Sequence, residues 1–199
     1  MFQFIESICC ENKQLRNLEF HQTRFDYTRN DNFSENNPIL LDEIIHFPED
    51  LTDEKYKIRI EYDREIQSIE FQPYQIKPIE TIQLFEIDNK INYTYKYLDR
   101  WFFDEYLKES KTDDLVLVKS NYITDCIYSN IVFFDGSQWL TPRSCLLKGT
   151  MREALLQSEE IIQKNIKVSD LSYFKSFKRI NAMMNLEESQ ELDISLLLK

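Results

Sequence analysis

Glycine and histidine are both rare in this chain, whose 199 residues include two of each. The two glycines, Gly136 and Gly149, cannot form a G-x-G-x-x-G dinucleotide fingerprint or a Walker phosphate loop, because both motifs need closely spaced glycines. Two histidines argue against a His-rich metal site and against most histidine-based catalytic triads. The four cysteines show no C-x-x-C spacing, so we expect reduced thiols and no bound metal.

Long apolar runs and an excess of positive charge are missing as well. No stretch approaches the ~20 apolar residues of a membrane span, and the first ten residues carry an acid where a signal peptide is basic. The formal net charge is −11, which repels a nucleic-acid backbone. We therefore expect a cytoplasmic protein that binds neither membranes nor nucleic acid, with one domain or two small lobes.

The first half of the chain contains both the helical and the strand periods of apolar residues. Apolar and charged residues alternate over 56–62, which is typical of a half-buried strand. The segment bracketed by Pro73 and Pro78 is the best candidate for a crossover between two lobes. The predicted strands are 2–8, 15–18, 56–62 and 66–71, and the predicted helices are 18–25 and one that begins at Asn37–Pro38.

The second half contains further short strands and two helices. Asp135–Gly136 is a strong turn signal, and Thr150 with Glu153 matches a capping box at the start of a helix. Helices and antiparallel hairpins together predict an α+β fold in two lobes, residues 1–76 and residues 79–199. The other predicted elements are strands at 79–87, 114–118, within 123–134 and at 139–140, and a helix after Lys96 with Leu98, Trp101, Phe102 and Leu107 on its apolar side.

Three residues are candidates for a functional role, and each also has a simpler structural interpretation. Gly149 precedes a helix whose amino end attracts anions such as phosphate, or it is an ordinary glycine at a helix entry. Lys96 lies between two tyrosines that would lower its pKa for Schiff-base chemistry, or it is a surface lysine. Asp125 stands among apolar residues and is either a buried carboxylate that needs a cationic partner or a turn aspartate.

Six segments in order resemble one family. The chain resembles the class IV aminotransferases, pyridoxal-phosphate enzymes of fold type IV, and within them most resembles the lyases that act on 4-amino-4-deoxychorismate. The resemblance covers almost the whole chain and implies a two-lobed fold, with a small N-terminal α/β lobe and a strand-rich C-terminal lobe that binds the cofactor. The segments are FIESI at 4–8, EFHQTR at 19–24, KYLDR at 96–100, ITDCIYSNI at 123–131, TP at 141–142 with LKGTMR at 147–152, and INAMM at 180–184.

The resemblance implies a role for each matching residue. Lys96 would hold pyridoxal 5'-phosphate covalently and later move protons, and Asp125 would face the pyridine nitrogen and keep it protonated. Arg24 would clamp the cofactor phosphate. Asn130 would orient the loop of Asp125. The backbone amides at the Gly149–Thr150–Met151 helix start and at Asn181 and Ala182 would complete the phosphate cradle.

The chain departs from the family pattern at two places, and the resemblance leaves several functional hypotheses open. The family usually has glutamate at the position of Asp125, and this chain begins near a strand that an additional strand and a loop normally precede. The first functional hypothesis is a lyase that converts a small-molecule amine, 4-amino-4-deoxychorismate, to 4-aminobenzoate and pyruvate. The resemblance implies that such an enzyme acts in folate biosynthesis and is a homodimer. The alternatives are an aminotransferase of branched-chain or D-amino acids and a catalytically weak cofactor-binding protein. Arg59 would hold a substrate carboxylate, or it is a solvated strand arginine.

Overall fold

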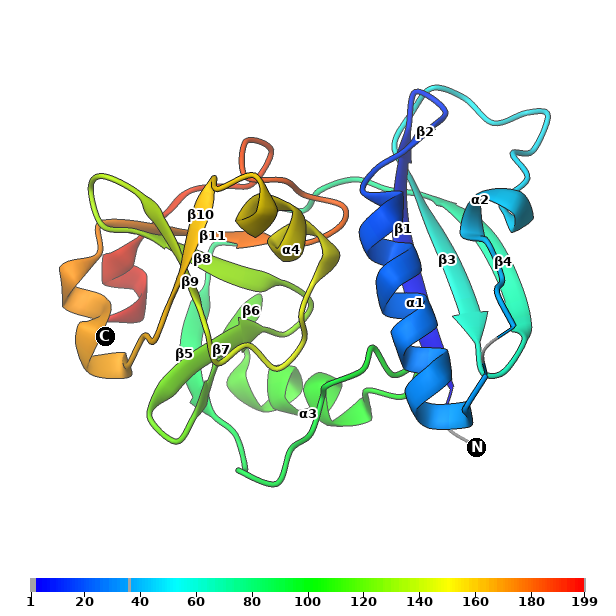
Figure 1. The fold of residues 1–199 in the computed structure, drawn as a ribbon. Coiled ribbons are helices and arrows are strands. Elements are labelled where there is room, and N and C mark those ends of the chain that lie inside the picture. The colour runs from blue at the N-terminus through cyan, green and yellow to red at the C-terminus, as the bar shows by residue number, and fades with distance from the viewer. Residues whose placement is uncertain (1–2, 36, 199) are drawn as a thin grey trace. The chain divides into compact units, whose positions relative to one another are not determined.

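The computed structural model describes residues 3–35 and 37–198, so the predicted strand residue Phe2 lies outside the described part. The chain has a mixed α+β fold, which confirms the predicted class (Figure 1). It divides into two compact units. The first unit contains Met1–Ile76 and Tyr95–Asp99, and the second contains Lys77–Thr94 and Arg100–Lys199.

The first unit is an antiparallel sheet with a helix against one face (Figure 1). Asn12 and Lys13 adopt positive φ angles of 52° and 58° and reverse the chain after its first strand. The helix α1 runs over Leu18–Phe33, eight residues beyond its predicted end. In sheet order the strands are β2 (Gln14–Leu15), β1 (Phe4–Glu11), β3 (Tyr56–Tyr62) and β4 (Ile66–Pro73).

Strand alternation builds the core of this unit. Ile58, Ile60 and Tyr62 are buried on one face of β3, and Phe25 of α1 belongs to the same apolar cluster. The polar residues between them lie on the other face, as the sequence period predicts. One acid breaks the apolar face, since Glu6 of β1 pairs with Ile60 and is completely buried.

The helix predicted at Asn37–Pro38 is shorter and begins later. The helix α2 covers only Leu41–Ile44, and the side chain of Gln22 on α1 accepts the Leu41 backbone N–H at 2.8 Å. A distant glutamine therefore caps this helix in place of the local asparagine. Local sequence could not reveal this, because the cap lies 19 residues away in the chain.

The second unit consists of two sheets with short helices (Figure 1). One sheet has the order β5-β6-β7 and the other the order β10-β9-β8-β11-β12, and a common apolar cluster includes Val116, Ile131 and Phe177. The strands are β5 (Ile82–Glu86), β6 (Asp114–Lys119), β7 (Tyr122–Cys126), β8 (Asn130–Phe134), β9 (Trp139–Pro142), β10 (Ile161–Lys164), β11 (Ser176–Ile180) and β12 (Leu192–Asp193), and the helices are α3 (Trp101–Ser110), α4 (Thr150–Gln157), η1 (Val168–Tyr173) and η2 (Ile194–Leu197).

Two helix predictions in this unit need correction. Trp101, predicted on the apolar side of α3, is 60% exposed, and Phe103 is the buried aromatic residue. The capping box is wrong, because Gly149 is the N-cap of α4 and no side chain caps the helix there. Thr150 is already within the helix, so it stands one position too late to serve as the cap.

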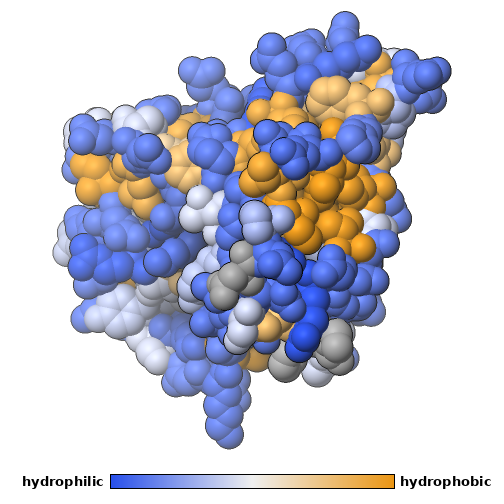
Figure 2. Space-filling view, turned by 45° about the vertical axis from the view of Figure 1, so that its right-hand side comes forward, coloured by the Kyte–Doolittle hydropathy of each residue, from blue (hydrophilic) through white to orange (hydrophobic). Residues whose placement is uncertain are grey.

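The surface of the first unit has an apolar patch, visible in orange in Figure 2. Leu40 and Phe47 are large apolar residues of this unit that are exposed to solvent, and the Phe47 ring meets that of Phe71 on β4 at 6.2 Å between centroids. No helix in the described part of the chain is both long enough and apolar enough to span a membrane.

Candidate functional site

Lys96 is held by backbone pairing with the first strand of the chain. The Ile5 N–H donates to the Lys96 carbonyl at 2.9 Å, and the Leu98 N–H donates to the Gln3 carbonyl at 2.8 Å. These bonds place the lysine segment along the edge of β1, in the first unit. The sequence prediction placed it within residues 79–199, and the difference arises because the pairing joins segments about ninety residues apart.

Aromatic side chains fix the same segment from both sides of Lys96. The rings of Tyr95 and Tyr97 lie 5.9 Å and 5.3 Å from the ring of Phe4, between centroids. The Tyr95 hydroxyl also donates a hydrogen bond to Asp31 on α1. The two tyrosines therefore anchor the backbone of Lys96 to the sheet, and a lowered lysine pKa stays a prediction.

A buried charged cluster joins β1 to α1 in this unit. Glu6 and His21 are both completely buried, and Arg24 is 14% exposed at its side chain. The Arg24 guanidinium donates from Nε to Glu6 Oε1 at 2.8 Å and from Nη2 to Glu6 Oε2 at 2.5 Å. His21 Nδ1 lies 2.6 Å from Glu6 Oε2. The carboxylate therefore binds two neighbours on one helix.

The charges in this cluster determine its protonation. Burial alone would raise the pKa of Glu6, but the charge and hydrogen bonds of Arg24, together with those of His21, lower it to about 2. Burial lowers the pKa of His21, and the positive charges of Arg24 and Lys96 act in the same direction, against the pull of Glu6. Glu6 is therefore ionised, and a neutral His21 donates to it from Nδ1.

Arg24 and Arg59 lie on opposite faces of the sheet. Arg24 bonds Glu6, which is opposite Ile60, whereas Arg59 is the preceding residue of β3 and is opposite Ser7. Arg59 forms an ion pair with Glu61, and both side chains are 24% exposed. The first unit therefore does not bring the two arginines together, and a substrate-binding role for Arg59 stays a prediction.

Asp125 in the second unit is a buried carboxylate, 5% exposed, at the end of β7. Its Oδ2 accepts the backbone N–H groups of Leu146 and Leu147 at 2.6 Å and 3.2 Å. Its Oδ1 accepts from Asn130 Nδ2 at 2.6 Å, and the same nitrogen donates to the Leu147 carbonyl at 2.9 Å. Asn130 therefore links Asp125 to the loop before α4, and its orienting role toward a cofactor stays a prediction.

The environment of Asp125 raises its pKa to about 6. Burial is the main cause, and the bonds from Asn130, Leu147 and Leu146 and the charge of Arg152 oppose it. Arg152 is almost completely buried, forms an ion pair with Glu153 and donates from Nη2 to the Pro142 carbonyl at 3.1 Å. The expected cationic partner therefore acts on Asp125 through its charge, while neutral N–H groups make the hydrogen bonds.

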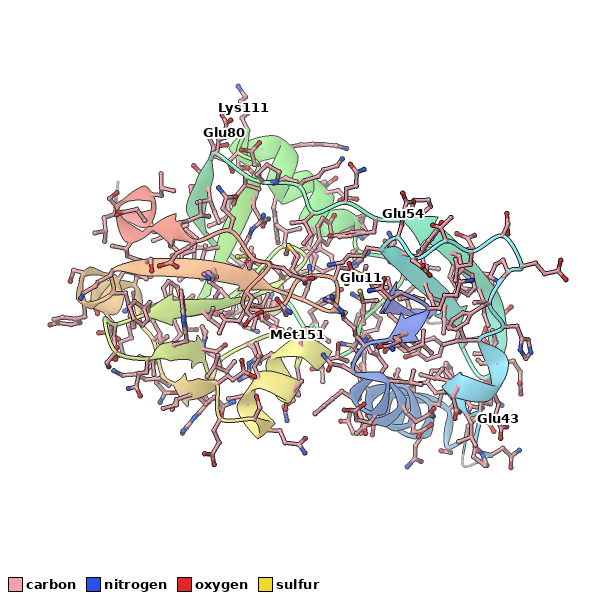
Figure 3. All side chains as sticks on the ribbon, turned by 90° about the horizontal axis from the view of Figure 1, so that it is seen from above. Glu11, Glu43, Glu54, Glu80, Lys111 and Met151 are labelled. Carbon is pink, nitrogen blue, oxygen red and sulfur yellow. The ribbon has the colours of Figure 1, made fainter. Side chains whose placement is uncertain are left out.

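Gly149 is required by the same network. A Cβ atom at Gly149 would overlap Asn130 Oδ1, so a larger residue would displace the amide that holds Asp125. Thr150 and Met151 form the amino end of α4 directly after this glycine, and both are buried; Met151 is labelled in Figure 3. Helix amino ends favour anions, and a phosphate-binding role for Gly149, Thr150 and Met151 stays a prediction.

Asn181 and Ala182 begin a tight turn after β11. The Asn181 side chain donates to the Tyr128 carbonyl at 3.2 Å and accepts the Met183 N–H at 2.9 Å. The Asn181 N–H donates to the Met184 carbonyl at 3.1 Å. A phosphate would therefore compete with Met184 for this amide, and the role of the Asn181 and Ala182 amides stays a prediction.

Sequence reasoning missed the partners of the chosen residues. Glu6 and His21 were noted only within the motifs, and Arg152 received no role. The available signal for Glu6 was an acid between Phe4 and Ile8 on one face of a predicted strand, since a buried carboxylate needs partners. In the described ranges, no group of three or more His, Cys, Asp or Glu side chains could hold a metal ion.

Comparison with known proteins agrees with the segment-by-segment resemblance. Residues 3–187 match the family model for amino-transferase class IV. An uncharacterised protein of Haemophilus influenzae is 31% identical over 189 residues, which cover 94% of this chain and 100% of that protein.

Solved structures show the same fold. A protein of Haemophilus somnus, provisionally named 4-amino-4-deoxychorismate lyase, superposes with a TM-score of 0.84 at 29% identity, over 94% of this chain and 98% of that one. A hypothetical aminotransferase of Mycobacterium tuberculosis in its PLP-bound form has a TM-score of 0.72 at 13% identity, over 96% and 80% of the two chains. The second likeness supports the fold alone.

Proposed function

The chain belongs to the class IV aminotransferase family, whose members use pyridoxal 5'-phosphate. Within this family, we propose that it is a lyase. Its substrate is 4-amino-4-deoxychorismate, and its products are 4-aminobenzoate and pyruvate. The predicted family and cofactor are thereby confirmed, and the reaction is our proposal. The observation that supports it is the buried Asp125 carboxylate, which accepts hydrogen bonds from Asn130 and two backbone amides and would serve the ring nitrogen.

The donor set of this chain fits the cofactor. Lys96 supplies an amine for the aldehyde, and Arg24 supplies a guanidinium for the phosphate. The amino end of α4 adds a second phosphate-binding element, and the glycine before it leaves no room for a Cβ. Asp125 supplies the acceptor for a protonated pyridine nitrogen. Each of these features suits one group of the cofactor: its aldehyde, its phosphate or its ring nitrogen.

When bound, the cofactor supplies an electron sink that stabilises negative charge on the substrate. Lys96 Nζ removes the ring proton from the substrate and delivers it to the methylene carbon of the departing enolpyruvyl group. The ring carbon–oxygen bond breaks, the ring becomes aromatic, and pyruvate leaves. No oxidant, reductant or water is consumed. Asp125 would accept the hydrogen bond of the protonated ring nitrogen, and Arg24 would hold the phosphate.

Two features of the sequence favour the lyase over an aminotransferase. The segment Asn181–Met184 resembles the lyase pattern, and Met151 stands where aminotransferases of this family tend to have threonine. The likeness to the Haemophilus somnus protein supports the same choice. An aminotransferase would use the same lysine and is the second candidate, supported by the family model itself.

The deciding experiment measures both reactions with one preparation. The purified chain is incubated with 4-amino-4-deoxychorismate, and 4-aminobenzoate and pyruvate are quantified. A parallel sample receives branched-chain or D-amino acids with 2-oxoglutarate, and glutamate is quantified. Equal amounts of 4-aminobenzoate and pyruvate, absent with Lys96→Ala, are expected. Glutamate formation alone would replace the lyase by the aminotransferase, and no product with bound cofactor would indicate a catalytically weak binding protein.

We further propose that the active form is a cytoplasmic homodimer, as the family resemblance implies. Light scattering during size-exclusion chromatography measures the mass directly against the chain mass of 24.1 kDa. A mass near twice that value is expected across a tenfold range of protein concentration. A constant mass of one chain would contradict the homodimer without affecting the proposed reaction.

A further inference from the structure

The strongest group outside the proposed reacting set is the buried Glu6 carboxylate. It lies on the apolar face of β1, opposite Ile60, where the neighbouring side chains are hydrophobic. It accepts three bonds, two from Arg24 and one from His21. A buried ionised acid is costly unless its partners are well placed. The cost points to a role beyond packing.

The geometry of the ion pair determines how Arg24 is presented. Glu6 binds the guanidinium from the side, through Nε and Nη2, and Nη1 takes no part in these bonds. A planar guanidinium gripped along one edge has a fixed plane and a fixed direction for its other donors. His21 restrains the carboxylate in turn, since its Nδ1 lies 2.6 Å from the oxygen that also binds Nη2.

We propose that Glu6 is a positioning residue that orients Arg24 for the cofactor phosphate, with His21 as the buried brace of the carboxylate. The inference rests on the proposed function, in which Arg24 binds that phosphate. Without Glu6, the guanidinium would have to be ordered during binding, and part of the phosphate affinity would be lost. The amine and ring contacts of the cofactor would be unaffected.

The experiment compares two probes that differ only in the phosphate, pyridoxal 5'-phosphate and pyridoxal. Dissociation constants are measured by absorbance for the wild type, Glu6→Gln, Glu6→Asp and Asp114→Asn. Asp114 is the matched control, because it is also a buried carboxylate and accepts from Arg179 at 2.8 Å. We expect Glu6→Gln to weaken the binding of pyridoxal 5'-phosphate about tenfold and the binding of pyridoxal less than about twofold. Glu6→Asp should recover part of this lost affinity. Asp114→Asn should change the affinities for the two probes by the same factor.

A double-mutant cycle tests whether Glu6 acts through Arg24. In the Arg24→Ala background, Glu6→Gln should cause no further loss of phosphate affinity. Equal losses for both probes, or a full additional loss in that background, would overturn the proposal. An Arg24→Ala variant that binds both probes like the wild type would instead refute the proposed phosphate anchor.

A measurement without cofactor keeps the inference testable if a variant is unstable. The Arg24 Nε–H should give a resolved NMR signal that exchanges slowly with water in the wild type, because it is hydrogen-bonded to a buried carboxylate. Glu6→Asp should shift this signal, and Asp114→Asn should leave it unchanged. A rapidly exchanging Arg24 Nε–H in the wild type would show that Glu6 does not orient the guanidinium.

Discussion

Lys96 is the single residue on which the proposed chemistry depends. Its backbone is fixed by the Ile5 N–H, so replacement of the side chain should leave the pairing with β1 intact. We expect Lys96→Ala to fold, to lose covalent attachment of the cofactor and to lose activity by about 10²-fold or more. Borohydride reduction followed by peptide mass analysis should place the cofactor on Lys96 in the wild type. Label on Lys90 instead would contradict the assignment.

The environment of Asp125 should make the free energy of unfolding depend on pH. Its pKa is about 6 in the folded chain and 3.8 for an ordinary aspartate, so the folded state retains its proton over this range. Its contribution to stability therefore falls as pH rises from about 4 to about 6, and then stays constant. Asparagine carries no such penalty and can still accept the Leu146 and Leu147 N–H groups.

We therefore expect Asp125→Asn to gain stability relative to the wild type over that interval, by up to about 3 kcal/mol. Urea unfolding of the cofactor-depleted proteins at about pH 4 and about pH 7 measures the change. The same variant should bind cofactor but lose turnover sharply, because no carboxylate supports the ring nitrogen, and Asp125→Glu should be milder. Parallel stability curves for the two proteins would contradict the raised pKa.

At the scale of elements, the entry to α4 depends on one glycine. The Gly149→Ala variant should push Asn130 away from Asp125, because the new Cβ would overlap Asn130 Oδ1. Loss of the bonds to Asp125 and Leu147 should destabilise the chain by about 1–3 kcal/mol. Chemical denaturation measures this loss, and cofactor affinity should fall with it.

Two further variants separate the overlap from a general backbone effect. In the Asn130→Ala background, Gly149→Ala should cost much less, because the overlapping oxygen is absent. Gly136 is the comparison, since its φ of 106° makes alanine strained there for a reason unrelated to Asn130. The cost of Gly136→Ala should therefore be the same in both backgrounds. Additive costs for Gly149→Ala and Asn130→Ala would argue against the predicted overlap.

At the scale of the whole molecule, binding of the cofactor should stabilise the folded state. Cofactor at about 100 times its dissociation constant should stabilise the folded chain by about 2.7 kcal/mol. Hydrogen exchange should slow at Tyr95–Asp99 and at the amino end of α4 in the same titration. Unchanged exchange at Tyr95–Asp99 would contradict the role of Lys96, and unchanged exchange at the amino end of α4 would contradict its role in phosphate binding.

The sequence by itself determined the features that depend on neighbouring residues. The alternation at 56–62 predicted the half-buried strand β3, and the aspartate–glycine pair at 135–136 predicted the turn before β9. The ordered motifs predicted the family and its cofactor, because those residue types are tied to the chemistry they perform.

Only the tertiary structure decided which distant groups meet. It placed Lys96 beside β1, gave Gln22 the cap of α2 and paired Arg24 with Glu6. It also gave Asp125 backbone amides for partners and moved the cap of α4 to Gly149. These contacts follow from where the chain returns in space, and burial then determines which side chains must be satisfied there and how their pKa values shift.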